Sequence, residues 1–239
     1  LIRSTSDIYL NDIHYLSSLV GLERWHDNKL WYLSKYAMSF DGMIYLGHNV
    51  AKLIVSLLGR SKKALILDFD NTIWGGSIGE GGKDHIEVGE GTPIGESYTD
   101  FQHYVLSLQR RGVILAACSK NDEASALEGL SQIDSVLKLE HFSAKQINWS
   151  DKDTNIRKVA EELSLGLDAM VFLDDDPVER ELVKSQLPKV TTPDLPPGEV
   201  VFMDLLDKEG FFEPTLFTKE DSSRAETYRR RAGVESSTK

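Results

Sequence analysis

Short apolar runs that alternate with amphipathic segments are the feature of this sequence that most limits its fold. The apolar runs lie at residues 64–67, 113–117 and 169–173, and helical periodicity occurs near 96–111, 122–132 and 151–165. Strands that are apolar along their whole length are typical of a parallel sheet covered by helices on both faces. The sequence therefore predicts a doubly wound α/β fold, in which ligands bind at the carboxyl ends of the strands.

The first 60 residues differ from this pattern and predict a separate helical appendage. Apolar residues recur at helical spacing from Asp41 to Leu58, and Gly59 ends the segment. We expect the appendage at 1–60, a catalytic domain at 61–233 that closes with a helix near 218–231, and a tail at 234–239. The chain starts without Met and without a signal peptide, so we expect it to be a piece of a longer polypeptide.

Composition excludes several classes of protein. No apolar run approaches the roughly 18 residues that a membrane span requires. The net charge of -11 disfavours binding to nucleic acid, because a phosphate backbone requires a basic surface. The single cysteine, Cys118, allows no internal disulfide and fits a reducing cytoplasm. We therefore expect a cytoplasmic protein that binds neither membranes nor nucleic acid.

Carboxylates crowd at the ends of two predicted strands. Asp68 and Asp70 follow the first run, and Asp174 and Asp175 follow the third. Such carboxylates would repel one another unless a cation lies among them, and Mg²⁺ prefers oxygen ligands. One carboxylate could then attack phosphorus while a second protonates the leaving oxygen. Surface aspartates also cap helices and fill turns, and Asp176 suits such a cap because Pro177 follows it.

Four segments resemble the motifs of the haloacid dehalogenase-like superfamily, in the order that the superfamily has them. They are Asp-Phe-Asp-Asn-Thr at 68–72, Ser119, Lys152, and the pair Asp174-Asp175. The resemblance implies a phosphoryl-transfer core with Asp68 as the nucleophile and Asp70 as the general acid/base. It implies Mg²⁺ held by Asp68, Asp70 through its carbonyl, and Asp175, with Asp174 as the alternative. The predicted substrate- and phosphate-binding residues are Asn71, Thr72, Ser119, Lys120, Asn121 and Lys152, with Lys145 as the competitor of Lys152.

A finer resemblance connects the chain to FkbH-like proteins. The segments that carry it are Trp-Gly-Gly at 74–76, Cys-Ser-Lys-Asn at 118–121, Asn-Trp-Ser-Asp-Lys at 148–152 and the region 172–180. The family implies 1,3-bisphosphoglycerate as substrate and a phosphopantetheinylated acyl carrier protein as partner, in polyketide biosynthesis. It also implies that Cys118 carries the three-carbon acyl unit as a thioester. The glycine-rich stretch at 75–95 predicts a short flap, which would leave the site open to a carrier.

From the residues alone, Cys118 could be either a catalytic nucleophile or a buried residue of the core. It ends an apolar run, and cysteine is often buried. Adjacent strand residues face opposite sides, so Cys118 and Ser119 share a site only if the strand has already ended. Two other functions therefore remain open: a phosphatase in which Cys118 only packs, and an inactive docking domain of a larger assembly.

Overall fold

The computed structural model describes residues 9–132, 134–195, 202–213 and 227–228. The described residues form two compact units. The first comprises the N-terminal residues up to Ser61 together with Glu213, and the second comprises residues 62–212 and the short described segment near the C-terminus. The predicted tail and most of the predicted closing helix lie outside the described residues.

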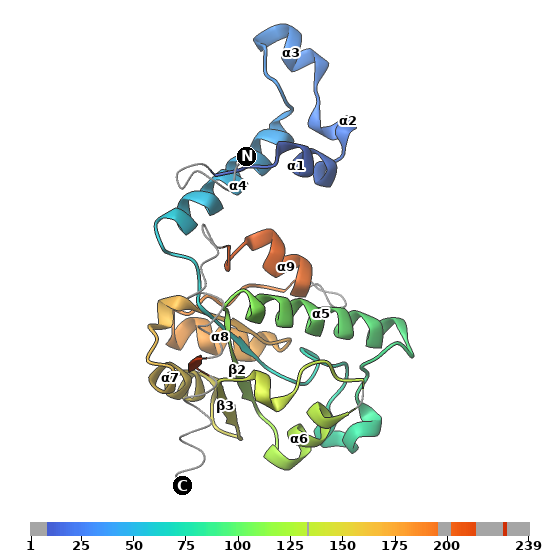
Figure 1. Cartoon of the computed structure of the whole chain (residues 1–239), viewed down its shortest axis with the longest axis vertical. Coiled ribbons are helices and arrows are strands. Elements are labelled where there is room, and N and C mark those ends of the chain that lie inside the picture. Colours follow the sequence, from blue (N-terminus) through green and yellow to red (C-terminus); the bar gives the residue numbers. More distant parts are fainter. Residues whose placement is uncertain (1–8, 133, 196–201, 214–226, 229–239) are drawn as a thin grey trace. The chain divides into compact units, whose positions relative to one another are not determined.

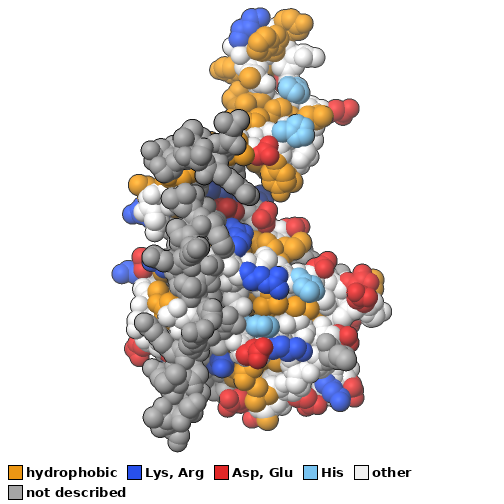
Figure 2. Space-filling view, in the orientation of Figure 1, with side chains coloured by type: hydrophobic (Ala, Val, Ile, Leu, Met, Phe, Trp, Pro, Cys, Tyr) orange, Lys and Arg blue, Asp and Glu red, His pale blue; other side chains and the backbone are white. Residues whose placement is uncertain are grey.

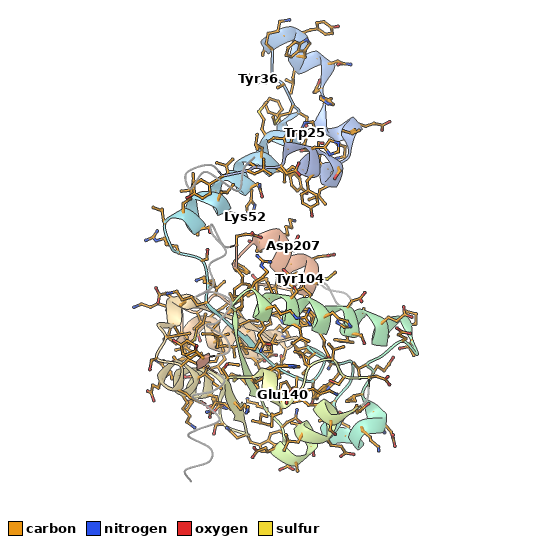
Figure 3. The ribbon with its side chains drawn as sticks, viewed as in Figure 1. Trp25, Tyr36, Lys52, Tyr104, Glu140 and Asp207 are labelled. Carbon is orange, nitrogen blue, oxygen red and sulfur yellow. The ribbon has the colours of Figure 1, made fainter. Side chains whose placement is uncertain are left out.

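The N-terminal unit is a small set of helices: α1 (Ile13–Val20), α2 (Leu22–Trp25), α3 (Asn28–Ser34) and α4 (Phe40–Leu57). Its core is small, because Leu16, Val20 and Trp25 are its only buried apolar cluster among the described residues. Trp25 lies against α4 (Figure 3), where Gly42 leaves room for the indole ring. Many apolar side chains of this unit remain exposed, as the orange atoms in Figure 2 show.

The second unit is built on a four-stranded parallel sheet of order β3-β2-β1-β4. The strands are β1 (Ala64–Leu67), β2 (Ile114–Ser119), β3 (Ala144–Ile147) and β4 (Met170–Leu173). The edge strand β3 escaped the sequence analysis, because its short run is interrupted by Lys145 and Gln146. The central strand β1 pairs with both β2 and β4, so the carboxyl ends of these three strands lie side by side.

Helices cover both faces of this sheet. They are α5 (Pro93–Arg110), α6 (Glu123–Ser131), α7 (Lys152–Glu162), α8 (Pro177–Gln186) and α9 (Phe202–Glu209). Leu65 and Leu67 of β1 pack in one apolar cluster with residues of α5, α6 and α9, whereas Ala64 and Ile66 pack in another with residues of α7 and α8. Figure 1 shows α5 and α9 running beside each other on their face. The predicted doubly wound α/β fold is confirmed.

A compact flap follows β1 where the sequence predicted one. Two backbone hydrogen bonds between Gly75 and Glu87 close its base. Between them lie two short 3-10 helices, η2 (Ile78–Glu80) and η3 (Gly82–His85). Two further 3-10 turns, η4 (Leu139–His141) and η5 (Leu167–Ala169), precede β3 and β4. The flap thus occupies the position of a cap without forming a domain of its own.

None of the helices in the described part of the chain is both long enough and apolar enough to cross a bilayer.

Candidate active site

Three carboxylates meet at the carboxyl edge of the sheet. Asp68 directly follows β1, and Asp174 and Asp175 directly follow β4, whose last residue pairs with the last residue of β1. One oxygen from each of the three carboxylates lies within 4.8 Å of the others. The topology of two adjacent parallel strands therefore brings together three of the four predicted carboxylates, and the carboxylate of Asp70 is not among them.

Lys152 lies at the centre of this group. It is the first residue of α7, and its side chain is almost fully buried. Its Nζ atom lies 2.5 Å from Asp68 Oδ1 and 3.1 Å from Asp174 Oδ2, and it donates a hydrogen bond of 2.7 Å to the carbonyl oxygen of Cys118. Lys145, the competing candidate, is exposed on β3. The structure thus brings Lys152, and not Lys145, to the carboxylates.

Burial and neighbouring charges shift the pKa values of the ionisable groups in the site. Burial raises the pKa of Asp68 to about 7, with a further upward contribution from the charge of Asp174. Burial and the same neighbour raise the pKa of Asp175 to about 6. Burial also raises the pKa of Asp174, although Lys152 opposes it. For Lys152, burial lowers the pKa, but the charges of Asp68 and Asp174 outweigh it and the net pKa is raised.

These residues fit a divalent cation. The Oδ2 atom of Asp174 is buried and is ion-paired with Lys152 at 3.1 Å; because a carboxylate oxygen has two lone pairs, this contact leaves one available to a metal. Three carboxylates against one lysine leave an excess of buried negative charge, and hard cations take carboxylate oxygens. Asp68, Asp174 and Asp175 are the side chains able to hold the ion. Both candidates of the Asp174-Asp175 pair therefore face the site.

The carboxylate of Asp70 differs from those of the other aspartates because its hydrogen bonds come from the flap. Its Oδ1 accepts hydrogen bonds from Trp74 Nε1 at 2.9 Å and from the backbone N–H of Ile78 at 3.2 Å. Its Oδ2 accepts one from Ser77 Oγ at 2.9 Å. All three donors belong to the start of the flap. The Asp70 carboxylate is therefore held by the flap and is not part of the group formed by Asp68, Asp174 and Asp175; coordination of a metal through its backbone carbonyl stays a prediction.

Asn71 and Thr72, predicted to bind phosphate, occupy structural positions. Asn71 has a left-handed backbone with φ of 49°, and its side-chain oxygen accepts a hydrogen bond of 2.8 Å from the N–H of Gly76. Its own N–H donates to the carbonyl of Gly76. Asn71 therefore closes the turn that starts the flap. The side chain of Thr72 is fully buried, and its Oγ1 has no hydrogen-bond partner among the described residues.

The residues at and after the end of β2 divide into two groups. Ser119 is buried and hydrogen-bonds to Asp68, which favours the ionised form of that carboxylate. Asn121 donates from Nδ2 to Ser119 Oγ at 3.1 Å and so orients the serine. Lys120 instead forms an ion pair of 2.5 Å with Glu179 at the start of α8. Of the predicted phosphate-binding residues, the structure thus places Ser119 and Lys152 beside Asp68, with Asn121 behind Ser119 and Lys120 paired with Glu179.

Cys118 does not have the surroundings expected of a nucleophile. Strand β2 continues through Ser119, so Cys118 and Ser119 face opposite sides, and Cys118 packs in the apolar cluster beneath α7 and α8. The residue has no exposed surface, and burial raises the pKa of its thiol to about 12 despite the charge of Lys152. A neutral, enclosed thiol is a poor nucleophile. This placement differs from the predicted catalytic role.

Arg180 supports the backbone that carries two of the carboxylates. This buried residue of α8 donates from NH1 to the carbonyl oxygens of Asp174, at 2.8 Å, and Asp175, at 2.7 Å. It thereby fixes the backbone from which both carboxylates project. The only signal in the sequence was an arginine four residues after an Asp-Pro helix start, which does not reveal a contact with the preceding turn.

Comparison with known proteins agrees with this architecture. No protein-family profile matches the chain, and no curated protein sequence matches it. Among solved structures, the chain is similar to the crystal structure of the N-terminal part of the protein BF1531 from Bacteroides fragilis, which contains a phosphatase domain and is complexed with Mg. The two chains are 38% identical with a TM-score of 0.81, and the match covers 85% of this chain and 54% of that chain. The chain therefore combines the predicted doubly wound α/β fold with similarity to a phosphatase domain, and it spans about half the length of the protein chain that contains that domain.

Proposed function

We propose that this chain is a Mg²⁺-dependent phosphatase that uses Asp68 as a covalent nucleophile. The observation that carries the proposal is the group formed by Asp68, Lys152 and the Asp174-Asp175 pair at the carboxyl ends of β1 and β4. The similarity to a phosphatase domain complexed with Mg supports it.

The side chains divide the reaction among themselves. Asp68 is held by Lys152 and Ser119 with its carboxylate oriented, so it attacks phosphorus without further reorganisation. Lys152 supplies positive charge to oxygens of the transferred phosphoryl group. Asp70, whose carboxyl group accepts hydrogen bonds from the start of the flap, gives its proton to the leaving oxygen and later takes one from the attacking water. A bound Mg²⁺ would neutralise charge between the phosphate and the carboxylates of Asp68, Asp174 and Asp175.

Phosphate release tests the proposal directly. A panel of aryl and alkyl phosphates should yield inorganic phosphate with Mg²⁺ and none with EDTA, and Asp68→Asn should release none under either condition. Intact-mass analysis of the quenched reaction should find a phosphoryl adduct on the wild-type chain that Asp68→Asn lacks. Phosphate release that persists in Asp68→Asn would show that another group is the nucleophile.

The narrower proposal is acyl transfer from 1,3-bisphosphoglycerate to a phosphopantetheinylated acyl carrier protein, as in the FkbH-like family. The sequence segments around Trp74 and Cys118 favour it, and the small flap is compatible with a macromolecular partner. The burial of Cys118 and the raised pKa of its thiol count against it. Mass spectrometry after incubation with 1,3-bisphosphoglycerate decides between them: an acyl adduct absent from Cys118→Ala supports acyl transfer, and its absence from the wild type rejects it.

A further inference from the structure

The flap does more than cover the site, because all three hydrogen-bond donors to the Asp70 carboxyl come from its first residues. We infer that Trp74 and Ser77 are positioning residues that orient Asp70 for proton transfer, with Oδ2 as the oxygen that carries the proton. The inference rests on the proposed phosphatase function, in which Asp70 is the general acid/base.

The types of donor decide which oxygen carries the proton. Indole Nε1–H and backbone N–H groups donate and cannot accept. Oδ1 of Asp70 receives one of each, from Trp74 and Ile78, so a proton on Oδ1 would be directed against two fixed N–H groups. Oδ2 faces the hydroxyl of Ser77, which rotates and can either donate or accept. The described partner of Oδ2 can therefore hydrogen-bond to this oxygen whether or not the oxygen carries a proton.

The proton balance follows from this arrangement. As the bond from phosphorus to the leaving oxygen breaks, the Oδ2–H bond of Asp70 breaks and its proton passes to that oxygen. Asp70 is then a carboxylate, and the hydroxyl of Ser77 turns to donate to it. When water attacks the phosphorylated Asp68, its proton returns to Oδ2, and the carboxyl regains its first state. Trp74 and Ile78 donate to Oδ1 throughout and change nothing.

Packing keeps the Trp74 donor in place. The indole ring has no exposed surface, and its centroid lies 5.3 Å from that of Phe69 in a tilted arrangement. On its other side the ring lies against Gly129 of α6, where a Cβ atom would approach Trp74 Cη2 to 2.9 Å. Any larger residue at position 129 would push the ring away. The indole N–H is thus fixed by the protein core and not by the flap alone.

The geometry of the flap places the other two donors. Gly75 exchanges two backbone hydrogen bonds with Glu87, and Ser77 and Ile78 follow at the start of η2. Gly76 has a φ of 83°, and a Cβ atom there would lie 2.2 Å from the carbonyl oxygen of His85. Only glycine allows the two sides of the flap to approach this closely. The turn that delivers Ser77 to Asp70 therefore depends on Gly76.

Leaving-group dependence tests the inference. General acid catalysis assists a basic leaving group far more than one that departs readily as an anion. Phenyl phosphate and 4-nitrophenyl phosphate have similar shapes but differ in this respect. Trp74→Phe removes the N–H and keeps an aromatic ring, so we expect kcat/KM for phenyl phosphate to fall roughly ten- to hundredfold. The same variant should lose no more than about threefold with 4-nitrophenyl phosphate, whose leaving group needs little acid assistance.

Two further variants complete the experiment. Trp31→Phe changes an exposed tryptophan of the N-terminal unit, which contributes none of the site residues described above, and should leave both substrates unaffected. Ser77→Ala removes the partner of Oδ2 without disturbing the core, and we expect the same preferential loss on phenyl phosphate, roughly three- to tenfold. It carries the test if Trp74→Phe fails to fold, as a thermal unfolding scan will show.

The outcomes separate this inference from the function on which it rests. Equal losses on the two substrates, or no loss in either variant, overturn the positioning role while the phosphatase function stands. A wild-type protein that releases phosphate from neither substrate with Mg²⁺ overturns both.

Discussion

Asp68 and Cys118 lie at the ends of neighbouring strands, and both contact Lys152, yet their environments differ. Asp68 comes one residue after β1 ends, and its carboxylate reaches Lys152 and the other carboxylates. Cys118 is the last residue but one of β2; its backbone carbonyl accepts from the Lys152 ammonium, whereas its thiol contacts only the backbone carbonyl of Lys152, at 3.9 Å. The comparison teaches that reactivity here depends on where a strand ends and on which side a residue faces: Asp68 lies beyond β1 in the site, whereas Cys118 points away from its neighbour Ser119 and into the core.

The largest expected effect on activity is the difference between substitutions of the two candidate nucleophiles. Asp68→Asn should reduce phosphate release roughly 10³-fold or more, because it removes the atom that forms the bond. Cys118→Ala should stay within about threefold of the wild type, because the thiol contacts no reacting group. Initial rates with 4-nitrophenyl phosphate measure both. If Cys118→Ala were as inactive as Asp68→Asn, the two strand ends would be equivalent and the comparison would fail.

Lys152 connects the two positions, and its removal should lower stability as well as activity. Lys152→Met leaves the buried carboxylates of Asp68 and Asp174 without their cation, which costs about 3–5 kcal/mol when one partner of a buried pair is lost. Chemical denaturation in EDTA measures this loss, and added Mg²⁺ should recover part of it. Lys145→Met, on the exposed face of β3, is the matched control and should change neither stability nor rate. Equal destabilisation by the two variants would contradict the ion pairs described here.

Substitution of Arg180 should have a smaller effect, which concerns Mg²⁺ binding by the carboxylates beside Asp68. Arg180→Gln removes the two hydrogen bonds to the carbonyls of Asp174 and Asp175, so the carboxylates should bind Mg²⁺ roughly 10- to 100-fold more weakly. Titration calorimetry measures the affinity. Arg157→Gln is the matched control, because Arg157 also donates to a backbone carbonyl but at the far end of α8. Unchanged affinity in Arg180→Gln would leave this arginine with a packing role only.

The raised pKa values of the site predict how pH and Mg²⁺ act together. The pKa of Asp68 is about 7 and that of Asp175 about 6 without metal, both above their ordinary value. Their contribution to stability is therefore fully present below about pH 4 and is lost as pH rises through 6 to 7. Mg²⁺ favours the ionised carboxylates, so it should raise the unfolding temperature more at about pH 8 than at about pH 5.5, by a difference of at least about 2 °C. An equal shift at both pH values would argue against these carboxylates as ligands.

The smallest effect concerns the Cys118 thiol itself. With its pKa raised to about 12, the folded protein favours the neutral thiol, and this contribution to stability is lost as pH rises from about 9 toward 12. The wild type should therefore lose more stability between about pH 8 and pH 10.5 than Cys118→Ala does. Iodoacetamide should label Cys118 slowly in the native state and rapidly in denaturant. Fast native labelling would show an accessible thiolate and revive the acyl-transfer reading.

Much of the fold followed from local patterns. The apolar runs predicted three of the four strands, and helical periodicity predicted α4, α5, α6 and α7 with small differences at their ends. The edge strand β3 and the helix α9 were missed, because short segments with mixed residues owe their structure to the sheet or core on which they pack. The domain limits at 60 and 233 and the tail stay predictions.

For the site, the sequence by itself determined which residue types lie at the ends of two predicted strands, and it therefore indicated Asp68 and the Asp174-Asp175 pair, whereas Lys152 was indicated by its place in the order of the motifs. Chain order is enough for this, because parallel strands bring their carboxyl ends to one edge. Only the tertiary structure decided that Lys152 and not Lys145 meets the carboxylates, that Asn71 closes the flap, and that Cys118 faces the core. The direction of the Cys118 side chain depends on the exact residue at which β2 ends. The other outcomes depend on contacts between residues that lie apart in the chain. A local sequence pattern contains neither kind of information.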